Sequence, residues 1–181
     1  MKISNWLNVF ISLLIFTSCN GTENHDKSDM MDEILAHHKK YIYNHYPWVL
    51  SMEGGGIPDK VTLFSIGFAL VGPLDIHTAR KYLIDATKNL EKSINDHKKI
   101  RSHLIEYPFP IQNIEYELVL FDENKKRVKQ SGGMENPNNL SFILLNKGKI
   151  IYYVDNEKSN NHIPVHRETY EEAKRIVEIE L

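Results

Sequence analysis

The sequence has one cysteine, two tryptophans and no excess of charge of either sign. A single cysteine, Cys19, excludes an internal disulfide framework and any zinc site built from cysteine pairs. A formal net charge of −2 lacks the basic excess of a nucleic-acid-binding face, so we expect no nucleic-acid partner. Short basic clusters such as residues 125–127 stand among acidic residues, which is typical of a solvated surface.

Long hydrophobic runs are absent except at the N-terminus. Residues 6–16 are almost entirely apolar, but a membrane-spanning helix takes about 20 residues. Lys2 places a positive charge before this run, and the small residues Thr17 and Ser18 follow it. A short apolar run between a positive charge and small residues is typical of a cleaved signal peptide, here residues 1–18.

The end of this segment, Phe16-Thr17-Ser18-Cys19, resembles the lipobox of bacterial lipoproteins. The resemblance covers only the first 20 or so residues and implies nothing about the fold that follows. It implies transfer of a diacylglyceryl group to the Cys19 thiol, cleavage before Cys19 and acylation of the new amino group. Several acyl chains on one residue anchor a protein stably, because one chain alone binds a membrane only weakly. The resemblance therefore implies a protein of the bacterial cell envelope that faces the periplasm or the exterior.

The rest of the chain has the length of one domain. Residues 19–27 follow the cleavage site, are polar and lack periodicity, so we expect the lipidated cysteine and a tether there. Residues 28–181 contain globular proportions of apolar and charged residues and are expected to form a single α+β domain. Nothing in residues 28–181 indicates a characterised family.

Hydrophobic periodicity predicts the elements of this domain. In its first part we expect a helix from Ser28 or Asp29 to residue 46, an irregular segment at 48–58, a strand at 61–71, a helix at 76–94 capped by Asp75, and a short helix near 100–105. In its second part we expect a strand at 114–121, a loop at 131–139, a hairpin of residues 140–145 and 149–155 around Gly148, a polar loop at 156–167, and a helix opened by a capping box at Thr169.

The expected order is thus α-β-α(α)-β-β-β-α. Four strands, three of them consecutive, predict a mainly antiparallel four-stranded sheet packed with helices.

One weak candidate for a ligand-binding loop lies in the irregular segment. Backbone N–H groups of a glycine-rich loop such as Gly54-Gly55-Gly56 can bind an anion, and Glu53 stands beside them. Trp48 would provide an apolar contact for the same ligand. The plainer interpretation is a flexible connection between the first helix and the first strand.

Histidines and paired glutamates are the other candidates. His37, His38 and His45 fall on the first helix, where partly buried and solvated histidines are the plainer interpretation. His162 and His166 are separated by Pro164, which excludes a normal helical metal-binding spacing, and we predict no metal site. Glu115 and Glu117 alternate with apolar residues, as the solvent face of a half-buried strand does.

These observations favour a non-enzymatic, lipid-anchored envelope protein whose domain binds another protein or a small ligand, with no cofactor. The first alternative is an exported hydrolase, which requires Glu53, the glycines and a histidine to converge in one pocket. The second is a metal-binding envelope protein, which requires converging histidines. The sequence contains none of the HExxH, C-x-x-C or G-x-S-x-G motifs that would favour either alternative.

Overall fold

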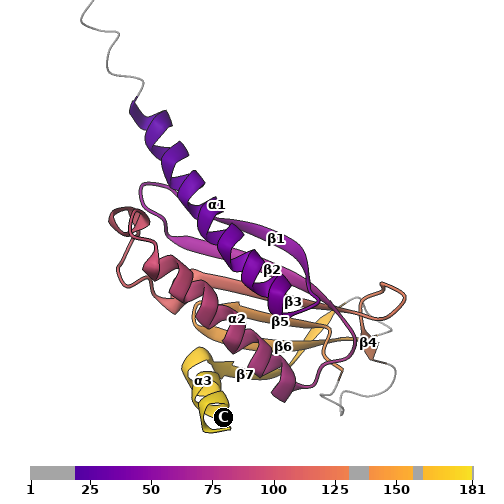
Figure 1. The fold of residues 1–181 in the computed structure, drawn as a ribbon. Coiled ribbons are helices and arrows are strands. Elements are labelled where there is room, and N and C mark those ends of the chain that lie inside the picture. The colour runs from indigo at the N-terminus through magenta and orange to yellow at the C-terminus, as the bar shows by residue number, and fades with distance from the viewer. Residues whose placement is uncertain (1–18, 131–138, 157–160, 181) are drawn as a thin grey trace, which may run out of the picture.

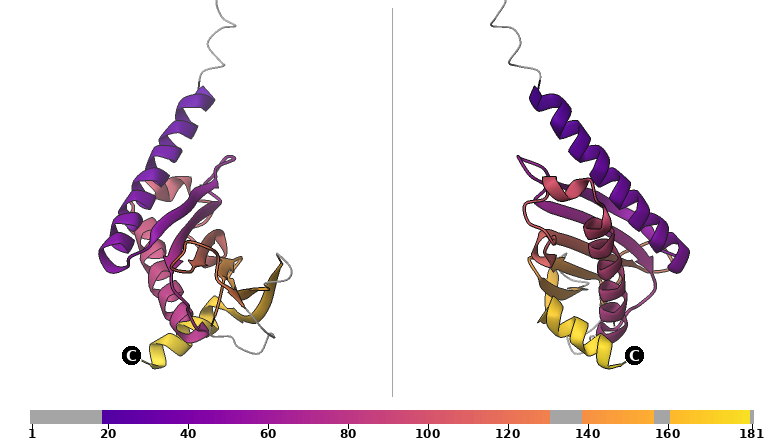
Figure 2. Two further views of the ribbon diagram at one scale, coloured as in Figure 1. Left: turned by 90° about the vertical axis from the view of Figure 1, so that its right-hand side faces the viewer. Right: turned by 60° about the vertical axis from the view of Figure 1, so that its left-hand side comes forward.

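The computed structural model describes residues 19–130, 139–156 and 161–180, so the predicted signal peptide lies outside the described residues. The described chain forms one α+β fold in which the helices lie on one face of a mixed sheet (Figures 1 and 2). The helices are α1 Cys19–His45, α2 Ile76–Asp96 and α3 Tyr170–Ile179, with short 3-10 turns η1 Ile100–His103 and η2 Ile111–Asn113. The strands are β1 Val49–Gly56, β2 Leu63–Val71, β3 Ile114–Phe121, β4 Lys129–Gln130, β5 Phe142–Asn146, β6 Lys149–Asn156 and β7 His162–Thr169.

The sheet is larger than the predicted four strands. Its long strands run in the order β1-β2-β3-β5-β6-β7, and the two-residue β4 also pairs with β6. The pairs β2–β3 and β4–β6 are parallel and all the others are antiparallel. Because parallel neighbours need a crossover connection, the chain passes through α2 between β2 and β3. The α+β class is confirmed, whereas the strand number and the element order were wrong.

Two strands were missed because their sequences do not look like strands. β1 occupies most of the predicted irregular segment, and its three glycines lie in a ladder with β2. β7 occupies the second half of the predicted polar loop, although it contains Pro164. Both are edge strands, where the weak strand preference of glycine and the missing N–H of proline cost little. Tertiary pairing therefore overrides local propensity at both edges of the sheet.

Helix α1 begins at Cys19 rather than at Ser28 or Asp29, so the predicted tether is helical. Its polar composition concealed the helix, but tertiary contacts begin early. Lys27 is only 4% exposed, and its ammonium group donates to the carbonyl oxygen of Asp59 at 2.9 Å. Among the described residues, no helix combines the length and apolar composition that a membrane span needs.

Several local predictions are confirmed. Asp75 caps α2 by accepting from the Thr78 N–H at 2.9 Å, and Thr169 forms the expected capping box with Glu172. Strand β3 has the predicted bounds, and β5 and β6 form the predicted hairpin, with Gly148 at a φ of 71°. The predicted short helix exists as the 3-10 turn η1, a tighter form common in short segments.

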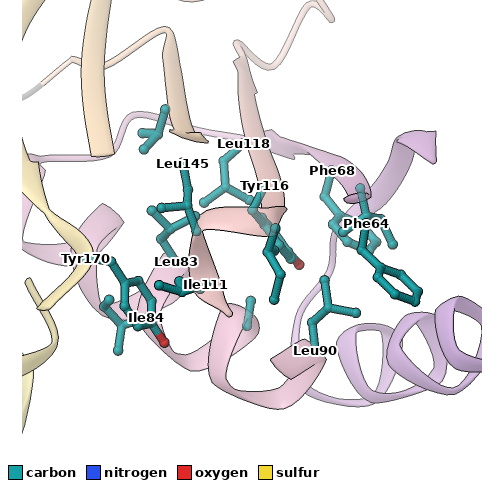
Figure 3. Packing of buried hydrophobic residues seen from close by; sticks show 14 of the residues in the cluster. Phe64, Phe68, Leu83, Ile84, Leu90, Ile111, Tyr116, Leu118, Leu145 and Tyr170 are labelled. Carbon is teal, nitrogen blue, oxygen red and sulfur yellow. The ribbon is translucent and has the colours of Figure 1, made fainter. Parts of the chain in front are cut away.

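The core lies between the sheet and the helices (Figure 3). Phe64 and Phe68 point from β2 toward the helices, and both are fully buried. Leu83 and Leu90 enter the same core from α2, and Tyr116 enters it from β3. This layer fixes α1 and α2 side by side over the sheet.

Candidate functional site

The predicted glycine loop is a strand that borders a small cavity. Gly54 and Gly55 line a cavity of about 200 Å³ between β1 and α1, together with Glu53. Glu53 is paired with Lys39 of α1 at 2.5 Å. No histidine stands among the residues that line this cavity, so the described structure does not bring together the groups that the hydrolase hypothesis requires.

Close packing explains the middle glycine. A Cβ atom on Gly55 would lie 2.2 Å from Met31 Cε and 2.5 Å from the carbonyl oxygen of Leu63. A Cβ atom on Gly54 would meet nothing within 4 Å. Gly55 therefore allows α1 to approach the sheet closely.

Trp48 stands apart from the glycines. Its side chain is 5% exposed and stacks on Tyr46, with ring centroids 4.1 Å apart. Six residues of extended strand separate it from Gly54, a span of roughly 20 Å. Trp48 therefore belongs to the hydrophobic core and not to a site around the glycines.

His38 is fully buried between α1, α2 and β3. Its Nδ1 lies 2.8 Å from Asn89 Oδ1, and its Nε2 lies 3.0 Å from the Tyr116 hydroxyl. Because an amide oxygen only accepts, Nδ1 carries the proton and Nε2 accepts from the tyrosine. Burial lowers the pKa of His38 to about 4, with a smaller opposing effect of the Asn89 hydrogen bond. This histidine is therefore neutral near pH 7, and both of its ring nitrogens form hydrogen bonds, so it has a structural role.

A recess lined mainly by polar and charged residues lies between α1 and the segment formed by α2 and the residues after it. A first cavity of about 340 Å³ has Ile34 at its apolar side, and its polar lining consists of Glu33, His37, Asn89, Lys92, Ser93, Asp96 and His97. A second cavity of about 380 Å³ shares Glu33 and is also lined by Asp26, Asp29, Met30, Lys99 and His103. We call the two together the α1–α2 groove. Ligand pockets commonly enclose about 300–1,000 Å³, so the groove has the size of a small-molecule site.

Three polar contacts organise the groove. His37 Nδ1 lies 3.2 Å from Ser93 Oγ, which joins the two helices. His97 Nδ1 accepts from the Ile100 N–H at 3.3 Å, so its Nε2 carries the proton and faces Glu33 Oε2 at 3.4 Å. The Glu33 side chain is 70% exposed. The groove thus offers imidazole, hydroxyl, amide and carboxylate groups to a bound molecule.

A second polar cluster lies across β5, β6 and β7. Asp155 is buried and accepts from the Ser141 hydroxyl at 2.9 Å and from His162 Nδ1 at 2.5 Å. Arg127 donates to His162 Nε2 at 3.1 Å. The serine bonds the carboxylate and not the imidazole, so this is not the order of a hydrolytic triad. The cluster joins the edge strand β7 to the sheet.

The remaining candidate residues are engaged in hydrogen bonds or ion pairs with neighbouring side chains, or are partly buried in the sheet. His166 lies 3.8 Å from Glu168, whose carboxylate is held by Arg80 at 2.9 Å. Asn146 donates to Glu115 at 3.3 Å, while burial raises the pKa of the neighbouring Glu117. Within the described ranges, no three His, Cys, Asp or Glu side chains converge as a metal site requires.

Comparison with known proteins finds no family model, no curated protein and no solved structure that matches this chain. The candidate site therefore depends on geometry alone. Sequence reasoning missed the groove because its walls come from helices far apart in the chain: His37 and Ser93 are separated by 56 positions. The only sequence signal was the polar side of the helix that contains Ser93 and Asp96.

Proposed function

We propose that this chain is a lipid-anchored protein of a bacterial cell envelope, and that its domain is a non-enzymatic module that binds a small polar ligand in the α1–α2 groove. The observation that carries the proposal is the continuity of α1. Cys19, the acylated residue of the lipobox resemblance, begins the helix that also forms one wall of the groove. Anchor and binding site then share one element.

The composition of the groove indicates the chemistry of its ligand. His37, Ser93 and Asn89 offer hydrogen bonds near the apolar Ile34. Asp26, Asp29 and Glu33 give the second cavity an acidic lining that Lys99 balances only in part. A small molecule with an apolar portion and a positively charged group fits both cavities.

Mass spectrometry of the protein extracted from its own membrane in mild detergent tests the anchor. We expect a chain that starts at Cys19 and carries acyl groups such as palmitate. A Cys19→Ala variant should lose both the acyl mass and the membrane association. A chain that starts at Met1, or an unmodified Cys19, would refute the anchoring.

Native mass spectrometry of the same extract tests the groove. We expect a non-covalently bound small molecule on the wild-type chain and its loss from Ser93→Phe, which fills the groove. Ser102→Phe is the matched control, because Ser102 is exposed and does not line the groove. Retention of the molecule by both variants, or a bound protein in its place, would contradict binding in the groove.

One contact favours an exported hydrolase as the second candidate. Ser93 Oγ and His37 Nδ1 are within hydrogen-bond distance inside an open cavity, which is the first pair of a nucleophile and its base. A fluorophosphonate probe distinguishes this candidate from simple binding. Labelling of the wild type that disappears in Ser93→Ala would favour the hydrolase, and an unlabelled wild type would favour the binding module.

A further inference from the structure

Asn89 of α2 connects the buried core to the α1–α2 groove. It lines the first cavity of the groove, and its Oδ1 lies 2.8 Å from Nδ1 of the buried His38. A side-chain amide has two different ends, an oxygen that accepts hydrogen bonds and an NH₂ group that donates them. The end that faces the groove therefore decides whether a ligand has to offer an acceptor or a donor at this point.

Tyr116 determines which ring nitrogen of His38 carries the proton. The tyrosine is fully buried and points from β3 into the core (Figure 3), where its hydroxyl lies 3.0 Å from His38 Nε2. Among the described residues, no other group forms a hydrogen bond with this hydroxyl. A buried O–H group needs an acceptor, and Nε2 of the neutral imidazole provides it. The proton of His38 is therefore on Nδ1.

His38 in turn fixes the orientation of the Asn89 amide. The Nδ1–H group requires an acceptor, so the oxygen of Asn89 faces His38 and its NH₂ group faces away. The opposite orientation would set two donors against each other, and a buried donor without a partner is costly. Within the described part of the chain, nothing accepts a hydrogen bond from Asn89 Nδ2. The NH₂ group is thus left to donate in the cavity that the apolar Ile34 also lines.

We infer that Tyr116 and His38 are positioning residues for the α1–α2 groove, which hold the NH₂ group of Asn89 toward the ligand and so select molecules with an oxygen acceptor beside their apolar portion. Neither Tyr116 nor His38 is among the residues that line the groove, so both act through Asn89. The inference rests on the proposed function and deepens it, because the cationic ligand with an apolar portion now also needs a carbonyl group. Amides of apolar amino acids combine these features: an ammonium group, an alkyl side chain and a carbonyl oxygen.

Two probes that differ in one group test this selection in the acylated mature chain, kept in mild detergent. Leucinamide has all of the required groups, and isopentylamine has the same ammonium group and alkyl portion without the carboxamide. At about pH 6.5 both amines are protonated and His38 is neutral. In calorimetric titrations we expect the wild type to bind leucinamide about fivefold more tightly, as one additional hydrogen bond implies.

Variants along the chain of hydrogen bonds should remove this preference. Asn89→Asp keeps an acceptor for His38 but has no NH₂ group, so the two probes should bind with similar affinity. Tyr116→Phe allows His38 to carry its proton on either nitrogen and the Asn89 amide to adopt either orientation, so the preference should decrease. Tyr152→Phe is the matched control: it removes a buried hydroxyl from β6 outside the groove and should keep the preference. A purely structural loss would weaken the binding of both probes equally.

Nitrogen NMR of the labelled protein measures the positioning without any ligand. We expect a protonated Nδ1 and an unprotonated Nε2 for His38 in the wild type, and a mixture or the reverse in Tyr116→Phe. A wild type with the proton on Nε2 would overturn the inference whatever the probes do. Equal affinity of the wild type for both probes would overturn the selection alone and leave binding in the groove intact. Binding of neither probe would overturn the proposed ligand class, and the selection with it.

Discussion

His38 shows how a single side chain links the helices to the sheet. It joins α1 to α2 through Asn89 and to β3 through Tyr116, with all of its hydrogen-bonding capacity used. The aromatic rings of Phe68 and Tyr116 surround it with edge-on contacts. Protonation would place a charge in this apolar layer and require the Tyr116 hydroxyl to turn and accept from Nε2 instead of donating to it. The low pKa of His38, about 4, expresses that cost.

The stability of the domain should therefore decrease in weakly acidic solution. The folded-state pKa of His38 lies below the unfolded value of 6.5, so the unfolded chain binds the extra proton first. The destabilisation caused by His38 is absent above pH 6.5 and increases as the pH falls. Below pH 4 it is complete, and the free energy of unfolding is then lower by about 3 kcal/mol. Urea unfolding between pH 7 and pH 4 measures it.

The variant His38→Gln isolates this contribution. Glutamine stays neutral, and both chains share the carboxylates Asp75, Asp96 and Glu172, whose pKa values are lowered by hydrogen bonds. The two stability curves should differ mainly between pH 6.5 and pH 4, with the wild type the steeper. Parallel curves would show that His38 does not titrate on unfolding in this range.

At the scale of elements, the close contact between α1 and β1 depends on Gly55, which has no side chain. Gly55→Ala would push a methyl group against Met31 and against the Leu63 carbonyl of the neighbouring strand. The methionine can move, but the backbone oxygen cannot, so we expect the free energy of unfolding to fall by about 2 kcal/mol. Gly54→Ala has open space and should change stability by less than about 0.5 kcal/mol. Thermal unfolding compares the two variants, and equal stabilities would contradict this account of the contact.

Elements with a clear local signal were predictable. The cap at Asp75, the capping box at Thr169 and the alternation of β3 depend on neighbouring residues, and all three are present. The glycine-rich β1 and the proline-containing β7 are stabilised by strands distant in sequence, which local periodicity does not report. Their omission reduced the sheet to four strands.

The candidate site was less predictable than the fold. Glu53, Gly54 and Gly55 do border a cavity, but the distant Trp48 packs in the core. The groove arises where the polar side of α2 meets the middle of α1, and neither helix indicates the other in the sequence. Such a site is visible only once the packing of the two helices is known.

At the scale of the whole molecule, the start of α1 and the C-terminal helix α3 lie at opposite ends of the domain. The beginning of α1 lies beyond the β1–β2 turn and η1, whereas α3 lies at the opposite end of the domain (Figures 1 and 2). The groove runs along the middle of α1, from Asp26 to His37, between these ends. If Cys19 is acylated as proposed, the groove lies roughly 10 to 27 Å along α1 from the anchored residue.

The helical course of α1 from Cys19 into the domain should control this arrangement. Replacing residues 20–24 by Gly-Ser-Gly-Ser-Gly keeps the length of the chain but removes the helix. Replacement by Glu-Ala-Ala-Ala-Lys keeps the helix and is the matched control. Both proteins should float with vesicles through their acyl chains. Quenching of a fluorophore on Ser102→Cys by doxyl-labelled lipid in the vesicles should fall several-fold in the glycine-serine protein, since a flexible spacer lowers the effective concentration of the domain at the membrane. Equal quenching in the two proteins would mean that the first residues of α1 do not control the distance of the domain from the membrane.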